Sequence, residues 1–120
     1  MSLNELLEHL IEALREELRQ HGEFLARIDD LQGSAPQEAA GRVRAVIEQH
    51  RALGDCRHKR EQIQHQVARL LGLSEPASAA GLARHLPAGR NLLVGALLEE
   101  NSDLSRRVES LRLHLQAGSY

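Results

Sequence analysis

The clearest pattern in the chain is a narrow apolar stripe in its last third, between residues 92 and 115. Apolar residues recur there every three or four positions, and one asparagine lies within the stripe. This spacing is typical of a helix that lies along another helix. The stripe consists of Leu93, Leu97, Asn101, Leu104, Val108, Leu111 and Leu115.

A second stripe opens the chain and predicts a helix over residues 2–31. Ser2 suits the N-cap, and Glu5 three residues later completes a capping box. At 1.5 Å per residue this helix would be roughly 45 Å long, so we expect an elongated fold. The stripe is Leu3, Leu7, Leu10, Leu14, Leu18, His21, Leu25 and Ile28, widened by Leu6, Ile11 and Phe24.

The middle of the chain predicts a helix over residues 36–71. Pro36 suits a first helical turn, and Gly72 ends the segment. The stripe weakens near Gly54, where an interior glycine costs about 1 kcal/mol relative to alanine. A kink near residue 54 and a break into two shorter helices are both open. The stripe is Val43, Val46, His50, Leu53, Arg60, Ile63, Val67 and Leu70.

Two further segments complete the expected architecture. A short helix over residues 78–86 would place Leu82 and Leu86 at one end of the bundle, and a closing helix would span residues 90–116. The closing helix also carries Leu92, Leu98 and Leu113 off its stripe, more apolar surface than one neighbour covers. We predict an all-α single domain over residues 1–120, an elongated antiparallel helical bundle of three long helices and a short connecting helix.

Composition supports helices and argues against a sheet. The chain has 120 residues, enough for one domain, with 22 leucines, one Phe, one Tyr and no Trp. Leucine without aromatic residues suits seams between helices better than deep ligand pockets. Four isoleucines, five valines and no threonine leave little material for strands.

The charge pattern bears on which helices pair. Net charge is −2, so nothing draws the whole chain to nucleic acid or to an anionic membrane. Residues 1–32 hold eight acids and three arginines, whereas residues 33–72 hold seven basic and four acidic residues. This favours pairing of the first two helices, although each exposed ion pair contributes only about 0–1 kcal/mol. We interpret the basic run of residues 57–60 as a solvated helix face.

Several features indicate a cytoplasmic protein without a membrane span. The single Cys56 allows no intramolecular disulfide and fits a reducing compartment. The N-terminus lacks the basic region of a signal peptide. The longest apolar run, residues 92–98, is far shorter than the ~20 residues that cross a bilayer.

Catalytic and metal-binding patterns are sparse. Asp55 and His58 alone have carboxylate-x-x-His spacing, and a di-iron bundle needs such pairs on two helices. Cys56 and His58 are two residues apart, so on a helix they face different sides. We therefore expect no enzyme, no catalytic residue, no metal site and no cofactor.

Other titratable residues have ordinary interpretations. We interpret Glu12, Glu16 and Glu17 as carboxylates on a polar helix face. His21 and His50 lie within apolar stripes, which favours histidines packed in a seam over a pH switch.

Three stretches resemble the FlgN-like flagellar export chaperones in order and character. They are residues 60–72 (REQIQHQVARLLG), 81–87 (GLARHLP) and 97–108 (LLEENSDLSRRV). In that family a second helix closes with an Arg/Leu/Gly pattern, a short leucine-and-proline segment follows, and the closing helix carries Asn before apolar positions. The family tends to show two asparagines three apart and then Gly, whereas this chain has Leu98 and the pair Asn101-Ser102.

The resemblance implies a cytoplasmic chaperone for hook–filament junction proteins of the FlgK and FlgL type. It would bind their C-terminal amphipathic helices and deliver them to the flagellar type III export apparatus. The implied contact residues are Leu93, Leu97, Asn101, Leu104, Val108 and Leu111. The alternative is a structural coiled-coil or adaptor protein that homodimerises through the closing helix. Asn101 would fix helix register, either within the bundle or with a partner.

Overall fold

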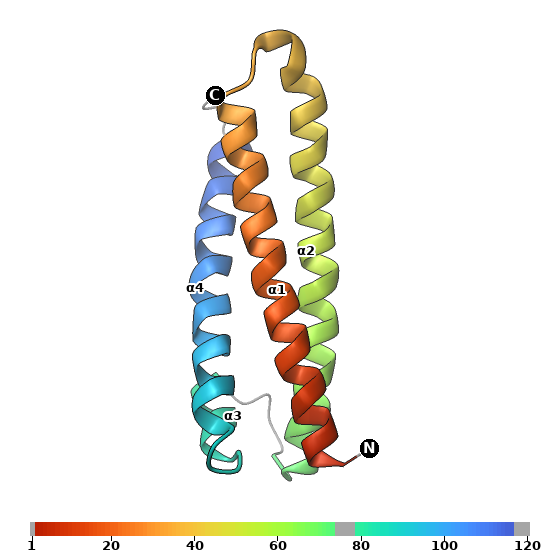
Figure 1. The fold of residues 1–120 in the computed structure, drawn as a ribbon, viewed down its shortest axis with the longest axis vertical. Coiled ribbons are helices and arrows are strands. Elements are labelled where there is room, and N and C mark those ends of the chain that lie inside the picture. Colours follow the sequence, from red (N-terminus) through yellow and green to blue (C-terminus); the bar gives the residue numbers. More distant parts are fainter. Residues whose placement is uncertain (1, 74–78, 117–120) are drawn as a thin grey trace.

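The computed structural model describes residues 2–73 and 79–116, which form four helices and no β-strand (Figure 1). The fold measures 53 × 22 × 22 Å. The predicted all-α, elongated bundle is therefore confirmed. The helices are α1 (Leu3–Gln32), α2 (Pro36–Leu70), α3 (Ala79–Arg84) and α4 (Asn91–Gln116).

The three long helices are not equivalent neighbours. In Figure 1, α1 and α4 run upward, and α2, which lies between them in the sequence, runs downward. α1 packs closely against both α2 and α4, whereas α2 and α4 approach each other much less closely. α3 packs against α4 at the lower end, where the N-terminus of α1 also lies. The bundle is thus organised around α1.

The helix ends follow local sequence chemistry. The hydroxyl of Ser2 accepts the Glu5 N–H at 3.2 Å and donates to the Glu5 carboxylate at 3.0 Å, so the expected cap forms. α2 begins with Pro36 in its first turn, and Gly72 follows its end with a φ of 76°, a conformation that glycine adopts readily.

The structure sets the extent of two predicted helices. α2 continues through Gly54 without a break. The short helix α3 ends at Arg84, earlier than predicted, because Leu86 precedes Pro87 and the residue before proline disfavours helical backbone. Residue 78, where the short helix was expected to begin, lies outside the described residues.

Buried apolar side chains form two clusters at different heights. The lower cluster includes Leu82 and Leu86, which cover that end of the bundle as expected. Its other members are Leu6, Leu7, Leu10, Ile11, Leu14, Val67, Ala68, Val94, Leu97 and Leu98. The upper cluster is smaller and consists of Phe24, Ile28, Leu31, Val46, Leu53 and Val108.

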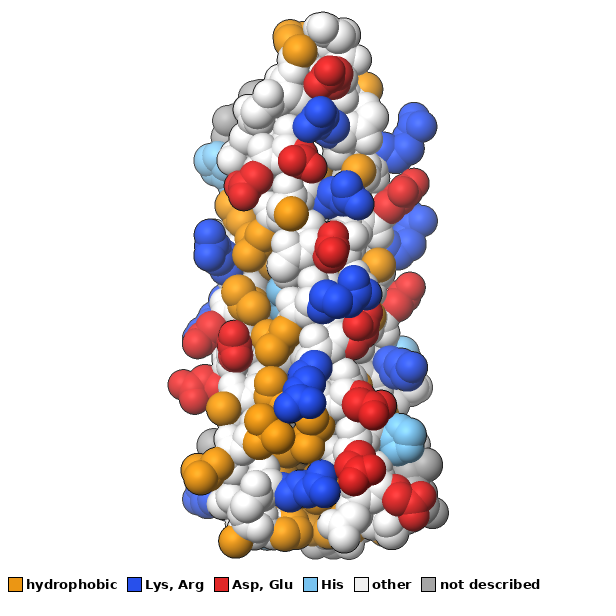
Figure 2. Space-filling view, in the orientation of Figure 1, with side chains coloured by type: hydrophobic (Ala, Val, Ile, Leu, Met, Phe, Trp, Pro, Cys, Tyr) orange, Lys and Arg blue, Asp and Glu red, His pale blue; other side chains and the backbone are white. Residues whose placement is uncertain are grey.

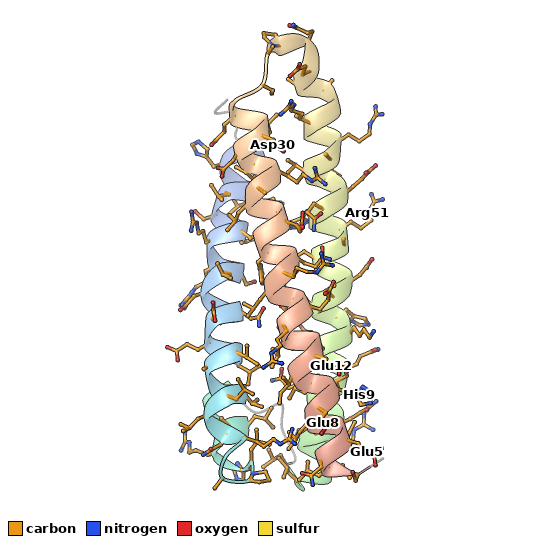
Figure 3. The ribbon with its side chains drawn as sticks, viewed as in Figure 1. Glu5, Glu8, His9, Glu12, Asp30 and Arg51 are labelled. Carbon is orange, nitrogen blue, oxygen red and sulfur yellow. The ribbon has the colours of Figure 1, made fainter. Side chains whose placement is uncertain are left out.

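The surface reflects the same division. Figure 2 shows hydrophobic side chains gathered along the lower half of the seam between α1 and α4. The exposed side chains Glu5, Glu8, His9 and Glu12 lie along the lower half of α1 (Figure 3). Among the described residues, no helix is both long and apolar enough to cross a membrane.

Candidate functional site

A layer of polar side chains separates the two apolar clusters. Glu17 is its centre, and 0% of this residue is exposed. Arg60 Nε donates to Glu17 Oε1 at 2.8 Å and Arg60 Nη2 donates to Oε2 at 3.2 Å, a two-pronged ion pair. We call this set the polar layer; it consists of Glu17 and His21 on α1, Arg57 and Arg60 on α2, and Asn101 on α4.

The polar layer holds Glu17 as a carboxylate. Burial alone would raise the pKa of Glu17, but the neighbouring His21 and Arg60 outweigh burial and lower the pKa below its ordinary value. His21 Nε2 lies 3.8 Å and Arg57 Nε 3.9 Å from Glu17 Oε2. The buried charge of Glu17 is therefore matched by Arg60, whereas Arg57 Nε and both ring nitrogens of His21 are buried without a hydrogen-bond partner. The acidic–basic pairing expected between the first two helices includes these contacts of Glu17 with Arg57 and Arg60.

The interpretation of Glu17 as a surface carboxylate was wrong. The apolar stripe of α1 has a seven-residue repeat at Leu3, Leu7, Leu10 and Leu14, and its continuation falls on positions 17, 21, 24 and 28. The predicted stripe instead used Leu18 and Leu25, each one position after the repeat. Both leucines are only half-buried, whereas Phe24 is fully buried. Strict continuation of the repeat was the signal that could have found Glu17.

The interpretation of residues 57–60 as a solvated helix face was correct for only two of the four residues. His58 and Lys59 are exposed, as a solvated face requires. Arg57 and Arg60 instead turn toward Glu17, with side chains 34% and 15% exposed. Arg60 keeps its position in the stripe predicted for α2 because a buried carboxylate on α1 faces it.

Asn101 ties α4 to α1. Its Nδ2 donates to the backbone oxygen of Leu14 at 3.1 Å and to that of Leu97 at 2.9 Å. Only 2% of the residue is exposed, and its Oδ1 is buried without a hydrogen-bond partner.

A groove lies between α2 and α4, on the side that α1 does not fill. Its volume is about 450 Å³. Asn101 lines it together with Ser102, the next residue, and Ser105, about one turn further along α4. The full lining is Arg60 and Gln64 on α2, and Leu98, Asn101, Ser102, Ser105, Arg106 and Glu109 on α4.

Apolar side chains extend the groove upward. Ile47 and Leu113 are each 54% exposed. Arg112 and Glu109 act electrostatically on His50, so these parts of α2 and α4 lie at the same height. Ile47 lies about one turn from His50 on the antiparallel helix, and Leu113 directly follows Arg112. The helical register therefore places one apolar side chain on each wall above the polar centre of the groove.

The six residues predicted to contact a partner are differently accessible. Leu97, Asn101 and Val108 are buried in the chain's own core, and Leu104 and Leu111 are half-buried. Leu93 is 39% exposed, and the neighbouring Val94 takes the buried position instead. Of the leucines off the stripe, Leu98 is buried, whereas Leu92 is 80% exposed and Leu113 is exposed at the upper end.

Cys56 on α2 and Glu16 on α1 line a second pocket of the bundle. Burial, with the negative charges of Glu16 and Glu17, raises the pKa of the Cys56 thiol, which disfavours the thiolate. Hydrogen bonding from Arg19 lowers the pKa of Glu16 to about 2, so this surface carboxylate stays ionised. Within residues 2–73 and 79–116, no group of three or more His, Cys, Asp and Glu side chains could hold a metal ion.

Comparisons of the chain with protein-family models, with curated proteins and with solved structures give no match. The FlgN-like resemblance therefore stays a prediction that rests on the three stretches of sequence.

Proposed function

We propose that this chain is a cytoplasmic flagellar type III export chaperone that holds a partner's amphipathic helix. Its cargo would be the C-terminal helices of hook–filament junction proteins of the FlgK and FlgL type. Holding these helices would prevent their premature association before delivery to the export apparatus. The FlgN-like resemblance of residues 60–72, 81–87 and 97–108 supports this choice of cargo.

The observation that carries the proposal is the open groove between α2 and α4. Two long helices flank it, α1 fills only its far side, and Ile47 and Leu113 expose apolar surface above it. An amphipathic helix laid along this groove would bury apolar anchors against Ile47 and Leu113 and keep its polar side chains over the polar lining. Contact with Val108 would require α4 to leave α1, because Val108 is fully buried in the chain's own core.

Isothermal titration with synthetic junction-protein peptides tests the proposal. We expect each C-terminal helix peptide to bind with one site per chain. A peptide of the same composition in scrambled order should not bind, because it has no amphipathic face. Equal heats for the native and scrambled peptides, or no binding of either, would contradict the proposed function.

The second candidate is a structural protein that homodimerises through α4. It is favoured by Leu92 and Leu93, which leave adjacent apolar side chains exposed at the lower end of α4. Sedimentation velocity separates the two candidates. A tight dimer that the Leu92→Asp substitution dissociates would favour the structural protein, and a monomer at micromolar concentration would favour the chaperone.

A further inference from the structure

We propose that the upper half of α4, residues 102–114, opens away from α1 as one unit while the lower half stays docked. The hinge lies at residues 101–103. This opening is a conformational device built into the fold, and it goes beyond the proposed function because it concerns the chain without a partner. The register of the helices, the polar layer and the hinge residues support it independently.

The register of α1 and α4 sets different kinds of side chain level with each other below and above Asn101. The two helices run parallel, and the hydrogen bond from Asn101 to Leu14 joins residues 87 positions apart. Because both helices rise about 1.5 Å per residue, the same offset relates the other residues that lie level with each other. These pairs are Leu7 and Val94, Leu10 and Leu97, Glu17 and Leu104, and His21 and Val108. Apolar residues of α4 thus lie level with apolar residues of α1 in the lower half, but with a carboxylate and an imidazole above Asn101.

The polar layer lowers the cost of opening at this height. Within residues 2–73 and 79–116, four buried side-chain polar atoms lack a hydrogen-bond partner, and all four belong to the layer. They are His21 Nδ1 and Nε2, Arg57 Nε and Asn101 Oδ1. Burial without a hydrogen bond costs free energy, which is recovered when water reaches the atom. Because Val108 is level with His21, separation of α4 from α1 above Asn101 hydrates the imidazole, whereas opening of the lower cluster would expose apolar side chains.

The polar contacts of the upper half of α4 lie within α4 itself. Asp103 pairs with Arg106, and Glu109 pairs with Arg112. The opposite charges of the second pair act on the pKa of His50, on α2, in opposite directions. Among the described residues, no hydrogen bond or ion pair joins the upper half to another helix. Apolar packing is therefore the main contact that holds this half against the rest of the bundle.

The proposed hinge lies where α4 is easiest to bend. Asn101, Ser102 and Asp103 are consecutive, and all three have lower helix propensity than leucine, arginine or glutamate. Their short polar side chains can bond nearby backbone groups in non-helical conformations, which lowers the cost of a local bend. Asn101 also bonds the Leu14 oxygen at 3.1 Å, so α4 stays attached to α1 directly below the hinge.

Opening gives the chain a second conformation with different accessible surface. Phe24 on α1 and Leu53 on α2 are buried in the same cluster as Val108. In the open conformation they lose the cover of α4, while the lower cluster keeps its packing. The upper cluster is therefore accessible for a fraction of the time in a folded chain.

Labelling of buried thiols tests the opening. Cys56→Ala removes the native thiol, and Val108→Cys or Val94→Cys then introduces one thiol at a fully buried position of α4. The rate of reaction with a small disulfide reagent reports how often each position opens. His21→Leu removes two unpartnered nitrogens, and His9→Leu makes the same change at an exposed position of α1. Circular dichroism checks the fold of each variant.

We expect the thiol of Val108→Cys to react at least about tenfold faster than that of Val94→Cys. Its rate should change little in low urea, because local opening exposes little surface, whereas the rate of Val94→Cys should rise with urea. His21→Leu should slow the reaction of Val108→Cys about fivefold or more, and His9→Leu should leave it within about twofold.

Equal rates for the two thiols would overturn the inference. It would also be overturned if His21→Leu slowed the upper thiol no more than His9→Leu, because the polar layer would then not promote opening. Should His21→Leu fail to fold, Asn101→Leu takes its place and should slow Val108→Cys about fivefold. These rates are measured without peptide, so a negative result here leaves the proposed function to its own test.

Discussion

The bundle is built differently below and above its polar layer. Below it, α4 contributes the buried side chains Val94, Leu97 and Leu98, and the α3 region adds Leu82 and Leu86. Above it, Val108 is the one buried residue of α4 among the side chains that the structure describes. Since each buried aliphatic side chain contributes about 1.5–3 kcal/mol, the lower half of α4 is anchored and the upper half is held more weakly.

This difference teaches what a buried polar layer does in a long three-helix bundle. An uninterrupted leucine seam would hold all of α4 against α1. Glu17, Arg60 and Asn101 replace three apolar positions at mid-height and divide the seam into two clusters. The division leaves the upper half of α4 near the groove with fewer contacts, which is where we place partner binding.

The largest predicted effect comes from breaking the polar layer at Glu17. Glu17→Leu should lower the free energy of unfolding by about 3–5 kcal/mol, because Arg60 then lacks its counter-charge in a mostly buried position. Urea denaturation followed by circular dichroism measures the loss.

The double variant Glu17→Leu/Arg60→Met provides the control. Replacement of both charged partners by apolar side chains removes the unpaired charge, so most of the lost stability should return. A single variant that loses less than about 1 kcal/mol, or a double variant no more stable than the single one, would contradict the role given to the ion pair.

A matched pair of valines compares the two halves of α4 directly. Val94 and Val108 are both fully buried, one in each cluster. Val94→Ala should cost about 2.5 kcal/mol and Val108→Ala about 1.5 kcal/mol, because the more loosely packed upper cluster can close around the lost methyl groups. Urea midpoints measure both costs, and equal or reversed values would remove the asymmetry.

Asn101→Leu sharpens the comparison from the opposite direction. It should raise the free energy of unfolding by about 1 kcal/mol, since it removes a buried carbonyl oxygen without a partner and joins the two clusters. Asn101→Asp is the control and should destabilise the fold, because a carboxylate would face the Leu14 and Leu97 carbonyl oxygens. Thermal unfolding of both variants gives the ranking, and a destabilised leucine variant would oppose it.

The smallest predicted effect is a pH dependence in the upper half. Burial, with the positive charge of Arg112, lowers the pKa of His50 from 6.5, and the ring meets Phe24 edge-on at 5.9 Å. As the pH falls, His50 is therefore protonated in the unfolded chain before it is protonated in the folded chain. The contribution of His50 to the free energy of unfolding is full above pH 6.5 and is lost as the pH falls through the lowered pKa of His50.

Two histidine variants isolate this effect. His50→Gln should flatten the fall in urea midpoint between pH 7.5 and 5.5, whereas His58→Gln, at an exposed position of the same helix, should keep the wild-type slope. A further fall in urea midpoint below about pH 4.5 should persist in both variants. The pKa of Glu17 is lowered in the folded chain from 4.5, so its contribution to stability is full above that pH and is lost as the pH falls through the lowered pKa. Identical slopes for all three proteins would rule out His50 as the source.

The helices could be predicted from sequence because leucine spacing and end signals agree. Ser2 with Glu5, Pro36 and Gly72 mark the ends of elements whose apolar period is clear over many turns. The break considered at Gly54 is not observed, since an interior glycine costs less than the packing of Leu53 and its neighbours gains.

The candidate site could be predicted only in part. The asparagine within the α4 stripe drew attention to Asn101, and that residue does line the groove. The groove itself depends on how α2 and α4 are spaced across α1, which the period of one helix does not encode. Burial of Glu17 depends equally on Arg60, which comes from another helix. The sequence of α1 alone therefore favoured the interpretation of Glu17 as a solvent-exposed carboxylate.

Hydrogen exchange along α4 tests most directly the claim that the polar layer divides the bundle. The comparison is between the amides of residues 93–99, below Asn101, and residues 103–109, which lie more than one turn from the helix end at Gln116. We predict that the upper amides open at least tenfold more often, a difference of about 1.4 kcal/mol or more. Equal protection on the two sides of Asn101 would contradict the account.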